Sequence, residues 1–531
     1  MMKWWRSLVL FCLCAFLAVS CGQSTPTASP DGRIVLGTTA TISTIDPADA
    51  SSSFASMLLY NLSDRLYTYK LGTNDLEPQL ATALPKVSAD GLTYTIPLRQ
   101  GVVFHDGTPF NAEAMAFSLN RLRENKGSAP VRLSEVEAVT ASGEYELTIK
   151  LEKPFTAFPT LLTFTGACAV SPKAYKIEAD AFQPKEFVGT GPYKLTKFGT
   201  DRIRMEAFDQ YWGGKPANPG VDIQLLSGGA NLYNSFRTGS IDLAIQGLAI
   251  EQIRNLRDDA ENRGWQMIEQ PGGSISVLVP NLRSAPLDKL EVRQALAAAV
   301  DRPLLQSRVF AGQIDPLYSL LPNHMKGQKP VFQAAYGDGK FEQAKARLQA
   351  AGFSTQNPAV IELWYRSNIT NDQLAALTLK ALIKKNLGDI LKIELNSVES
   401  TTAYNRLEQG VYPTFILDWS GDYFDPDTYL YPFLECSKGN AETLCESGQS
   451  AAWGSFYFSD QANQLLAASR QEQDPAKRQK LLEQLQQIVA TEVPFIPMWQ
   501  GKDYLFVQKG ITGASLEVTQ KVPFWKLKKA S

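Results

Sequence analysis

Strand and helix patterns alternate along most of this chain, and this alternation limits its fold more than any other feature. Apolar and polar residues alternate over 94–98 and 145–151, which is the period of a strand with one buried face. Apolar residues at helical spacing predict further helices at 111–127, 288–302, 341–351 and 474–494. Interleaved short strands and helices indicate a mixed α/β protein.

The expected helices carry their own start and stop signals. Asn111 is a good N-cap for the first, and Asp474, which precedes a proline, opens the last. Asp288 and Glu291 have the spacing of a capping box at the start of the second. Gly352 supplies the C-terminal stop of the third.

Length and composition exclude several classes of function. The 531 residues suggest three to four domain-sized units, at about 150 residues each. The net charge of −2, with no basic block, argues against a nucleic-acid partner. A catalytic zinc site usually takes two or three histidines, and the chain has only two, far apart. No G-x-S-x-G motif occurs, so we expect neither a metal site nor a catalytic triad, and no enzyme activity.

The first twenty residues have the pattern of an export signal. Lys3 and Arg6 precede an apolar run over 7–19, which is shorter than the roughly 20 residues of a membrane-spanning helix. Small residues before Cys21 resemble a bacterial lipoprotein cleavage site, at which that cysteine becomes the lipidated N-terminus; a plain signal peptide cleaved nearby is the alternative. We therefore expect a lipoprotein signal peptide at 1–20, and at 21–32 a lipidated cysteine with a flexible tether rich in Ser, Thr and Pro.

The remaining cysteines agree with an oxidising compartment. Cys436 and Cys445 flank a polar loop and are placed to close a small disulfide ring. A metal-binding pair is the weaker alternative, since no further ligand lies nearby in the sequence. Cys168 lies in an apolar run and is expected to be a buried small residue.

A series of motifs resembles one large family of receptors. Residues 93–122 read TYTIPLRQGVVFHDGTPFNAEAMAFSLNRL, which is similar to the signature of the oligopeptide-, dipeptide- and nickel-binding proteins of bacterial ABC transporters. Seven further motifs follow in the family's order: VGTGPYKL at 188–195, FDQYWGGKP at 208–216, FRTGSIDLA at 236–244, LEVRQALAAAVDRPLL at 290–305, FEQAKARLQAAGF at 341–353, WSGDYFDPDTYL at 419–430 and DPAKRQKLLEQLQQIVATEVPFIPMW at 474–499. The resemblance thus runs over nearly the whole chain after the tether.

The resemblance implies a two-lobed periplasmic-binding-protein fold with a hinge and an additional accessory domain. A ligand would bind in the cleft between the lobes, where a domain interface also favours a small-molecule site. The expected boundaries are a discontinuous lobe I at 33–70, 188–275 and 500–531, an accessory domain at 71–187, and a lobe II at 276–499.

Four residues are candidates for ligand contact. In peptide-binding relatives the aspartate of an aromatic-x-x-Asp pattern holds the ligand's α-ammonium, and Asp422 matches that position; its alternative role is to cap a turn. Trp419 and Tyr423 would flank the ligand, or else belong to the core. Arg366 is a candidate partner for the ligand carboxylate, although its local match to the family is poor, and a solvated arginine after a strand is the alternative.

The family resemblance implies a receptor that captures short peptides outside the cytoplasm and delivers them to the permease subunits of an ABC transporter. It implies a periplasmic monomer with no cofactor, held at a membrane by lipid on Cys21. The alternatives left open are the same receptor for a nickel or other metal chelate, an opine or an oligosaccharide, and a peptide-sensing or chaperone role.

Overall fold

The computed structural model of this protein describes residues 31–129, 131 and 133–530. The expected signal peptide and the expected lipidation site at Cys21 lie outside the described residues. None of the helices in the described part of the chain is long and apolar enough to cross a membrane.

One sheet of eleven strands runs through the molecule, in the order β15-β14-β16-β12-β19-β11-β1-β10-β9-β8, with β13 pairing beside β19. The strands of one end, which we call lobe I, are β1 (Ile34–Thr38), β8 (Tyr193–Phe198), β9 (Arg202–Ala207), β10 (Gly220–Leu225) and β11 (Leu243–Ile245). Those of the other end, lobe II, are β14 (Ala359–Arg366), β15 (Leu391–Val398) and β16 (Thr414–Ser420). The strands between them are β12 (Gln266–Pro280), β13 (Ile314–Pro316) and β19 (Ile496–Val507).

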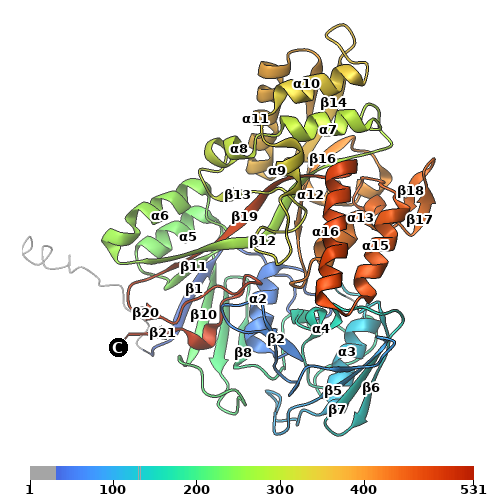
Figure 1. Ribbon diagram of the computed structural model, residues 1–531. Helices are drawn as coiled ribbons and strands as arrows, with labels where there is room; N and C mark the ends of the chain where they lie inside the picture. Colours follow the sequence, from blue (N-terminus) through green and yellow to red (C-terminus); the bar gives the residue numbers. More distant parts are fainter. Residues whose placement is uncertain (1–30, 130, 132, 531) are drawn as a thin grey trace, which may run out of the picture.

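Two long antiparallel strands, β12 and β19, connect the lobes. At one end of this ribbon Gln266 pairs with Val507, and β19 continues the sheet to β11 of lobe I. At the other end Leu278 pairs with Ile496, and β12 continues the sheet to β16 of lobe II. The register shifts between Pro271 and Ile275, so the regular ladder is interrupted midway between the lobes. Figure 1 shows this ribbon as the link between the upper and lower parts of the molecule.

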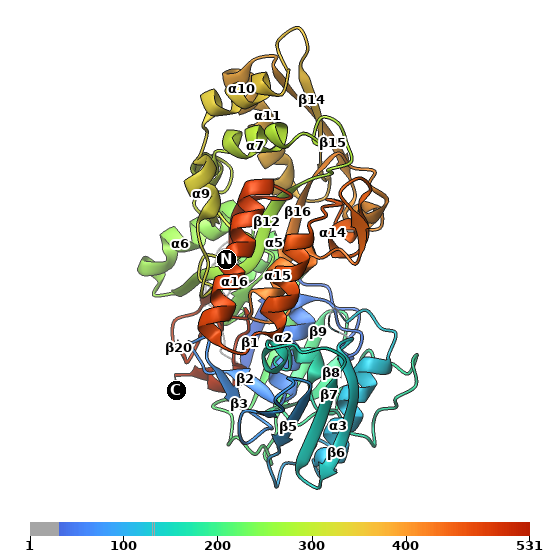
Figure 2. The same cartoon turned by 45° about the vertical axis from the view of Figure 1, so that its right-hand side comes forward.

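Helices cover both lobes. Lobe I has α2 (Ser53–Leu62), α5 (Gly229–Arg237) and α6 (Ile250–Arg263). Lobe II has α7 (Leu290–Ala299), α8 (Arg302–Arg308), α9 (Val331–Tyr336), α10 (Phe341–Ala350), α11 (Thr370–Leu387), α12 (Ser400–Tyr404), α13 (Asp427–Leu434), α14 (Gln449–Ala452), α15 (Asp460–Gln471) and α16 (Pro475–Glu492). The pair α15 and α16 reaches down from lobe II towards the lower part of the molecule in both views (Figures 1 and 2).

A third unit forms beside lobe I. Its four-stranded antiparallel sheet has the order β4-β5-β7-β6, and α3 packs on β6 and β7. The elements are β4 (Lys86–Val87), β5 (Thr93–Pro97), β6 (Val136–Gly143), β7 (Glu146–Leu151), α3 (Ala112–Glu124) and the short α4 (Phe158–Leu161). This unit has a hydrophobic core of its own, as do lobe II and lobe I. The expected mixed α/β class is confirmed.

The remaining strands form three small hairpin-like pairs outside the large sheets. They are β2 (Tyr67–Tyr69) with β3 (Leu76–Pro78), β17 (Lys438–Asn440) with β18 (Leu444–Ser447), and β20 (Ile511–Thr512) with β21 (Lys528–Lys529). The first and the last of these lie beside the segments that line the cavity described below.

Most of the predicted helix termini are confirmed. The Asn111 side chain caps α3 by accepting from the Ala114 N–H, and Asp474 caps α16. The predicted capping box of Asp288 and Glu291 is wrong, because α7 begins at Leu290 with no side-chain cap. The Arg293 side chain donates to the main-chain carbonyl of Asp288, and the Asp288 N–H donates to the Ser284 carbonyl. The segment 284–288 is therefore a turn and not the start of a helix.

The cysteines lie as separate structural features. Cys436 and Cys445 form a disulfide between two Cα atoms 5.6 Å apart, around the β17–β18 hairpin. Cys168 is a free thiol in the core between the third unit and lobe I, and burial raises its pKa to about 11. Its thiol is therefore neutral and acts as a small apolar group.

Candidate ligand-binding site

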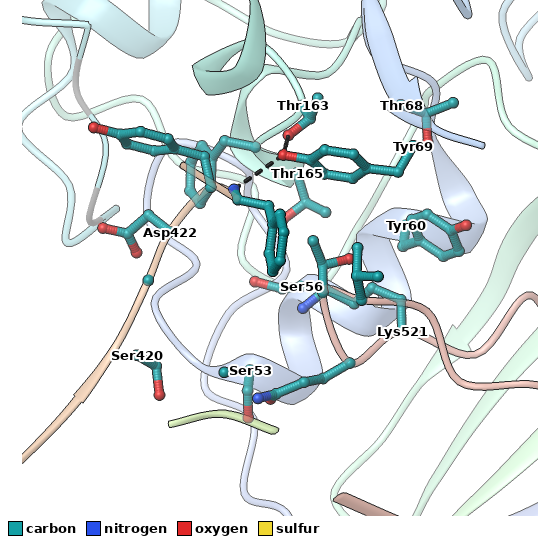
Figure 3. Close-up of a pocket in the computed structure, with 18 of the residues that line it drawn as sticks. Ser53, Ser56, Tyr60, Thr68, Tyr69, Thr163, Thr165, Ser420, Asp422 and Lys521 are labelled. Carbon is teal, nitrogen blue, oxygen red and sulfur yellow. Dashed lines mark hydrogen bonds between the residues drawn. The ribbon is translucent and has the colours of Figure 1, made fainter. Parts of the chain in front are cut away.

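A cavity lies where lobe I, lobe II and the third unit meet. The volume of this cavity is about 250 Å³. Lobe I contributes the first turns of α2, the segment 65–69 and the loop 518–521; the third unit contributes 163–165; lobe II contributes 420–429; and the β12–β19 ribbon contributes Gly273. Many lining side chains are hydroxyls, among them Ser53, Ser56, Thr163 and Thr165 (Figure 3). The cavity therefore presents hydrogen-bonding groups from every part that a hinge motion would move.

Asp422 enters this cavity from the end of β16. The strand ends at Ser420, and Gly421 follows where an added Cβ would lie 2.6 Å from the Thr428 side chain. Only glycine permits that close approach. The turn is then fixed by main-chain bonds, because the Gly421 N–H donates to the Tyr429 hydroxyl at 3.2 Å and the Asp422 N–H donates to the Thr428 hydroxyl at 3.3 Å.

Three aspartates follow one another in this turn, and arginines neutralise two of them. Asp425 accepts from both terminal nitrogens of Arg478, at 2.8 and 2.7 Å. Asp427 accepts from Arg470 at 2.8 and 2.9 Å. Within the described residues, no side chain or main-chain N–H donates to the carboxylate of Asp422, which lines the cavity instead. Of the three aspartates, Asp422 is the one whose carboxylate keeps no partner among the described residues.

Burial makes the free carboxylate of Asp422 costly. It raises the pKa of Asp422 to about 6, and the positive charge of Lys521 opposes the rise only in part. A buried carboxylate without a hydrogen-bond donor is unfavourable unless a cation joins it. The site is therefore suited to a positively charged group with N–H donors.

Sequence reasoning did not find the basic residues of the cavity. Lys521 lines it from the loop between β20 and β21, and the guanidinium of Arg65 lines it beside the ring of Tyr60, 5.0 Å away. Behind them on β19 lies Asp503, one of whose oxygens is buried with no hydrogen-bond partner among the described residues. No sequence pattern marks these three residues, because they come from segments that only the fold brings together.

The other three predicted residues take different places. Tyr423 lines the cavity, and its hydroxyl donates to Asp427 at 2.9 Å. Trp419 does not line it; its indole N–H donates to the Thr428 carbonyl at 2.8 Å, and its ring packs against Phe433 and Trp453. The aromatic pair therefore divides into one cavity residue and one core residue.

Arg366 lies away from this cavity. Its guanidinium pairs with Asp372 at 2.7 Å and also with Asp418, which in turn accepts from the Ser276 hydroxyl. Arg366 is buried, and the two carboxylates already neutralise its charge. The structure does not bring Arg366 and Asp422 together.

The family model described as bacterial extracellular solute-binding proteins, family 5 Middle, matches residues 75–441. This chain belongs to that family. The receptor is 27% identical over 504 residues to the glutathione-binding protein GsiB of Escherichia coli O1:K1, with 91% of each chain covered. It is 26% identical over 500 residues to the probable D,D-dipeptide-binding periplasmic protein DdpA of Escherichia coli K12, with 92% of each covered.

Solved structures agree with this family. The periplasmic binding protein DppA of Helicobacter pylori, described as ABC transporter-associated and in complex with the peptide STSA, superposes with a TM-score of 0.75 at 23% identity. The match covers 94% of this receptor and 98% of that chain. The expected two-lobed solute-binding fold is thus confirmed.

Direct contacts close the receptor around the cavity. The Phe424 N–H of lobe II donates to the Tyr69 hydroxyl of lobe I at 2.9 Å, and Thr163 of the third unit donates to the same hydroxyl at 3.3 Å (Figure 3). The third unit also touches α15, since the Thr156 N–H donates to the Arg470 carbonyl at 2.7 Å. One tyrosine oxygen thus joins all three parts of the molecule at the cavity wall.

Proposed function

We propose that this receptor captures short peptides in the cavity between its lobes and delivers them to the permease of an ABC transporter. The observation that carries the proposal is the half-buried carboxylate of Asp422, which has no donor among the described residues and faces the cavity. A peptide supplies the missing group, because its α-ammonium has three N–H donors and a positive charge.

The rest of the lining suits a peptide backbone. An enclosed peptide loses water from its amide groups, which then need donors and acceptors. Hydroxyls from α2 and the third unit supply both, and the rings of Tyr423 and Phe424 offer flat apolar surface for side chains. The similarity to GsiB, a glutathione-binding protein, and to DdpA, a probable D,D-dipeptide-binding protein, supports the same ligand class.

The proposal is tested with peptides whose N-terminus is free or blocked. A randomised library of di- to pentapeptides is incubated with the purified protein, and retained peptides are identified by native mass spectrometry. The same library is then N-acetylated, which removes the ammonium and keeps the side chains. We expect retention from the free library and a loss of at least tenfold from the acetylated one, measured by calorimetry on the best binder.

The opposite outcomes identify the alternatives. Equal binding of free and acetylated peptides would remove the ammonium from recognition. Retention of no peptide, with a metal chelate, an opine or an oligosaccharide carried through purification, would replace peptide by that cargo. Growth on the bound peptide, lost when the coding region is deleted, separates transport from sensing or a chaperone role.

We further propose a monomeric receptor that catalyses no reaction and is anchored by lipid on Cys21. The sequence before and after Cys21 supports the anchor. A Cys21→Ser variant should move from the membrane to the soluble extract, and the N-terminal peptide of the membrane form should carry the mass of the lipid. Unchanged fractionation argues against the anchor, and cleavage of the library by clean protein argues against a purely binding role.

We also keep the expected domain division, with lobe I at 33–70, 188–275 and 500–531, the accessory domain at 71–187 and lobe II at 276–499. Hydrophobic cores in lobe II, the four-stranded unit and lobe I support a division into three units, while Leu66 and Tyr67 pack in the accessory core and Cys168 and Phe187 in that of lobe I. Limited proteolysis, followed by mass spectrometry of the stable fragments, tests the boundaries.

A further inference from the structure

The cavity holds a second charged group that the ammonium site does not use. Lys521 points into it from the opposite part of the lining to Asp422, from the loop that precedes β21 (Figure 3). Among the described residues, Lys521 has no hydrogen-bond acceptor for its ammonium and no carboxylate within ion-pair distance. A half-buried ammonium with three free N–H groups is as incomplete as the carboxylate of Asp422.

The fold holds Lys521 in place by its backbone. The Glu517 N–H donates to the Lys521 carbonyl at 2.8 Å, and the Gln520 N–H donates to the Glu517 carbonyl at 2.8 Å, so 517–521 is a tight turn. Gln520 has a φ of 65°, a left-handed conformation that is strained for a residue with a side chain. The buried side chain of Asn61 in α2 donates to the main-chain carbonyl of Val522, the residue after Lys521, at 3.0 Å. The lysine therefore extends into the cavity from an anchored position.

Arg65 adds a second cation on the same side. Its guanidinium makes one hydrogen bond, from Nη1 to the Ser63 carbonyl at 3.4 Å, and its other N–H groups have no acceptor in the part of the chain that the structure describes. Asp503 lies behind Lys521, and the pKa of Lys521 falls to about 8 because burial and Arg65 outweigh the attraction of Asp503 and Asp422. The charged side chains that line the cavity itself are therefore one carboxylate, Asp422, and two cations, Lys521 and Arg65.

Charge balance then limits what the cavity accepts. A ligand that brings only an ammonium leaves a surplus positive charge in a poorly solvated space. A ligand that brings an ammonium and a carboxylate leaves the net charge of the cavity unchanged and gives both Asp422 and Lys521 a partner. Since the two groups line one cavity, and each residue of a peptide adds up to about 3.5 Å, a ligand of a few residues is suited to contact both.

We propose that Lys521, with Arg65 beside it, binds the C-terminal carboxylate of the ligand, so that the receptor selects di- and tripeptides with both ends free. This inference rests on the proposed function, since it takes the ligand to be a peptide held at Asp422. It assigns to Lys521 the role that the sequence suggested for Arg366.

The test compares the acid and amide forms of one peptide. A randomised di- and tripeptide library with free N-termini is prepared with C-terminal acids and with C-terminal amides, and the best acid binder is measured in both forms by calorimetry. We expect the amide to bind at least tenfold more weakly. In Lys521→Met the acid should lose at least tenfold while the amide changes less than threefold, so that the preference for the acid disappears.

Two further variants serve as controls. Lys521→Arg keeps the charge and should keep the preference for the acid. Lys526→Met changes an exposed lysine five residues further along, outside the cavity, and should leave both affinities unchanged. Circular dichroism and thermal melting of every variant establish that it is folded.

Each remaining outcome overturns a definite statement. Equal binding of acid and amide by the natural receptor overturns the inference and leaves the proposed function standing. An equal loss for both forms in Lys521→Met shows that this lysine only balances the charge of Asp422 and Asp503. Binding of neither form overturns the proposed function itself, and the inference with it.

Discussion

Replacing Asp422 by asparagine should weaken peptide binding and stabilise the empty receptor at the same time. Asparagine keeps the shape of the side chain and one acceptor oxygen, and it removes the charge. The pKa of Asp422 rises from its ordinary 3.8 to about 6, which corresponds to about 3 kcal/mol of penalty on the charged form. That figure is an upper bound on the stability that Asp422→Asn gains above pH 6.

The loss in affinity follows from the contact with the ammonium. A hydrogen bond to a charged group contributes about 1.5–3 kcal/mol, which is a loss of about 10- to 150-fold in Kd. We expect calorimetry with the best library peptide to find this loss. Chemical denaturation of the empty protein at pH 7.5 should find a higher free energy of unfolding. The exposed Asp75→Asn is the matched control and should change neither quantity.

The pH dependence of stability and of ligand affinity tests the role of the Asp422 carboxylate a second time. Because the folded pKa of Asp422 is raised, the natural empty receptor should lose stability relative to Asp422→Asn as pH rises from about 4 to about 6, and this difference should level off above that. Ligand affinity should rise over the same range, since the ammonium needs the charged carboxylate. Asp422→Asn should lose this rise in affinity, and its unfolding free energy should keep only the pH dependence of the other raised carboxyls, such as Asp372 and Asp503. A variant that loses stability, or binds peptide as tightly as the natural receptor, would refute the reasoning.

Three further predictions concern contacts that hold the receptor together. Tyr69→Phe leaves the Phe424 N–H without its acceptor, so peptide affinity should fall about 5- to 150-fold by calorimetry, with a smaller change in unfolding free energy because the bond crosses between lobes. Cys436→Ser opens a ring with a sequence separation of nine and should cost about 2–3 kcal/mol in chemical denaturation, and reductant should destabilise the natural protein but not the variant. Arg121→Met strands the fully buried Asp46, which it holds by two bonds of 2.7 Å, and should cost about 3–5 kcal/mol of unfolding free energy; a cost below 1 kcal/mol would contradict the role assigned to that ion pair.

The local elements could be predicted where one short pattern decides them. The strands over 93–97 and 146–151 follow from alternation alone, and α3 and α16 follow from apolar spacing between a capping residue and a stop. The start of α7 could not, because Arg293 ties the preceding carbonyls into a turn. A capping pattern in the sequence does not show that another side chain, here Arg293, binds the backbone carbonyls of the same segment.

The candidate site divides in the same way. Asp422 stands out by its place in a motif, and the fold then shows that its neighbours Asp425 and Asp427 are taken by arginines. Arg366 lies outside the cavity and pairs with Asp372, six residues along the chain, and with Asp418, which only the fold brings beside it. Lys521 carries no local signal at all. A residue's charge can be read from the sequence, whereas its available partners depend on packing between distant segments.

The ribbon of β12 and β19 has a consequence for how the receptor closes. Main-chain hydrogen bonds join the two strands of this pair. If one lobe slid past the other along the strands, all of these hydrogen bonds would break together. Bending out of the plane at the interrupted ladder near Pro271 breaks few of them. The easiest motion between the two lobes is therefore a hinge rotation about an axis that crosses the ribbon. Gly273 belongs to the interrupted stretch of the ribbon and lines the cavity, so the cavity lies close to this axis. Contacts that cross between the lobes, such as the Phe424 N–H with the Tyr69 hydroxyl, oppose this rotation and hold the receptor shut.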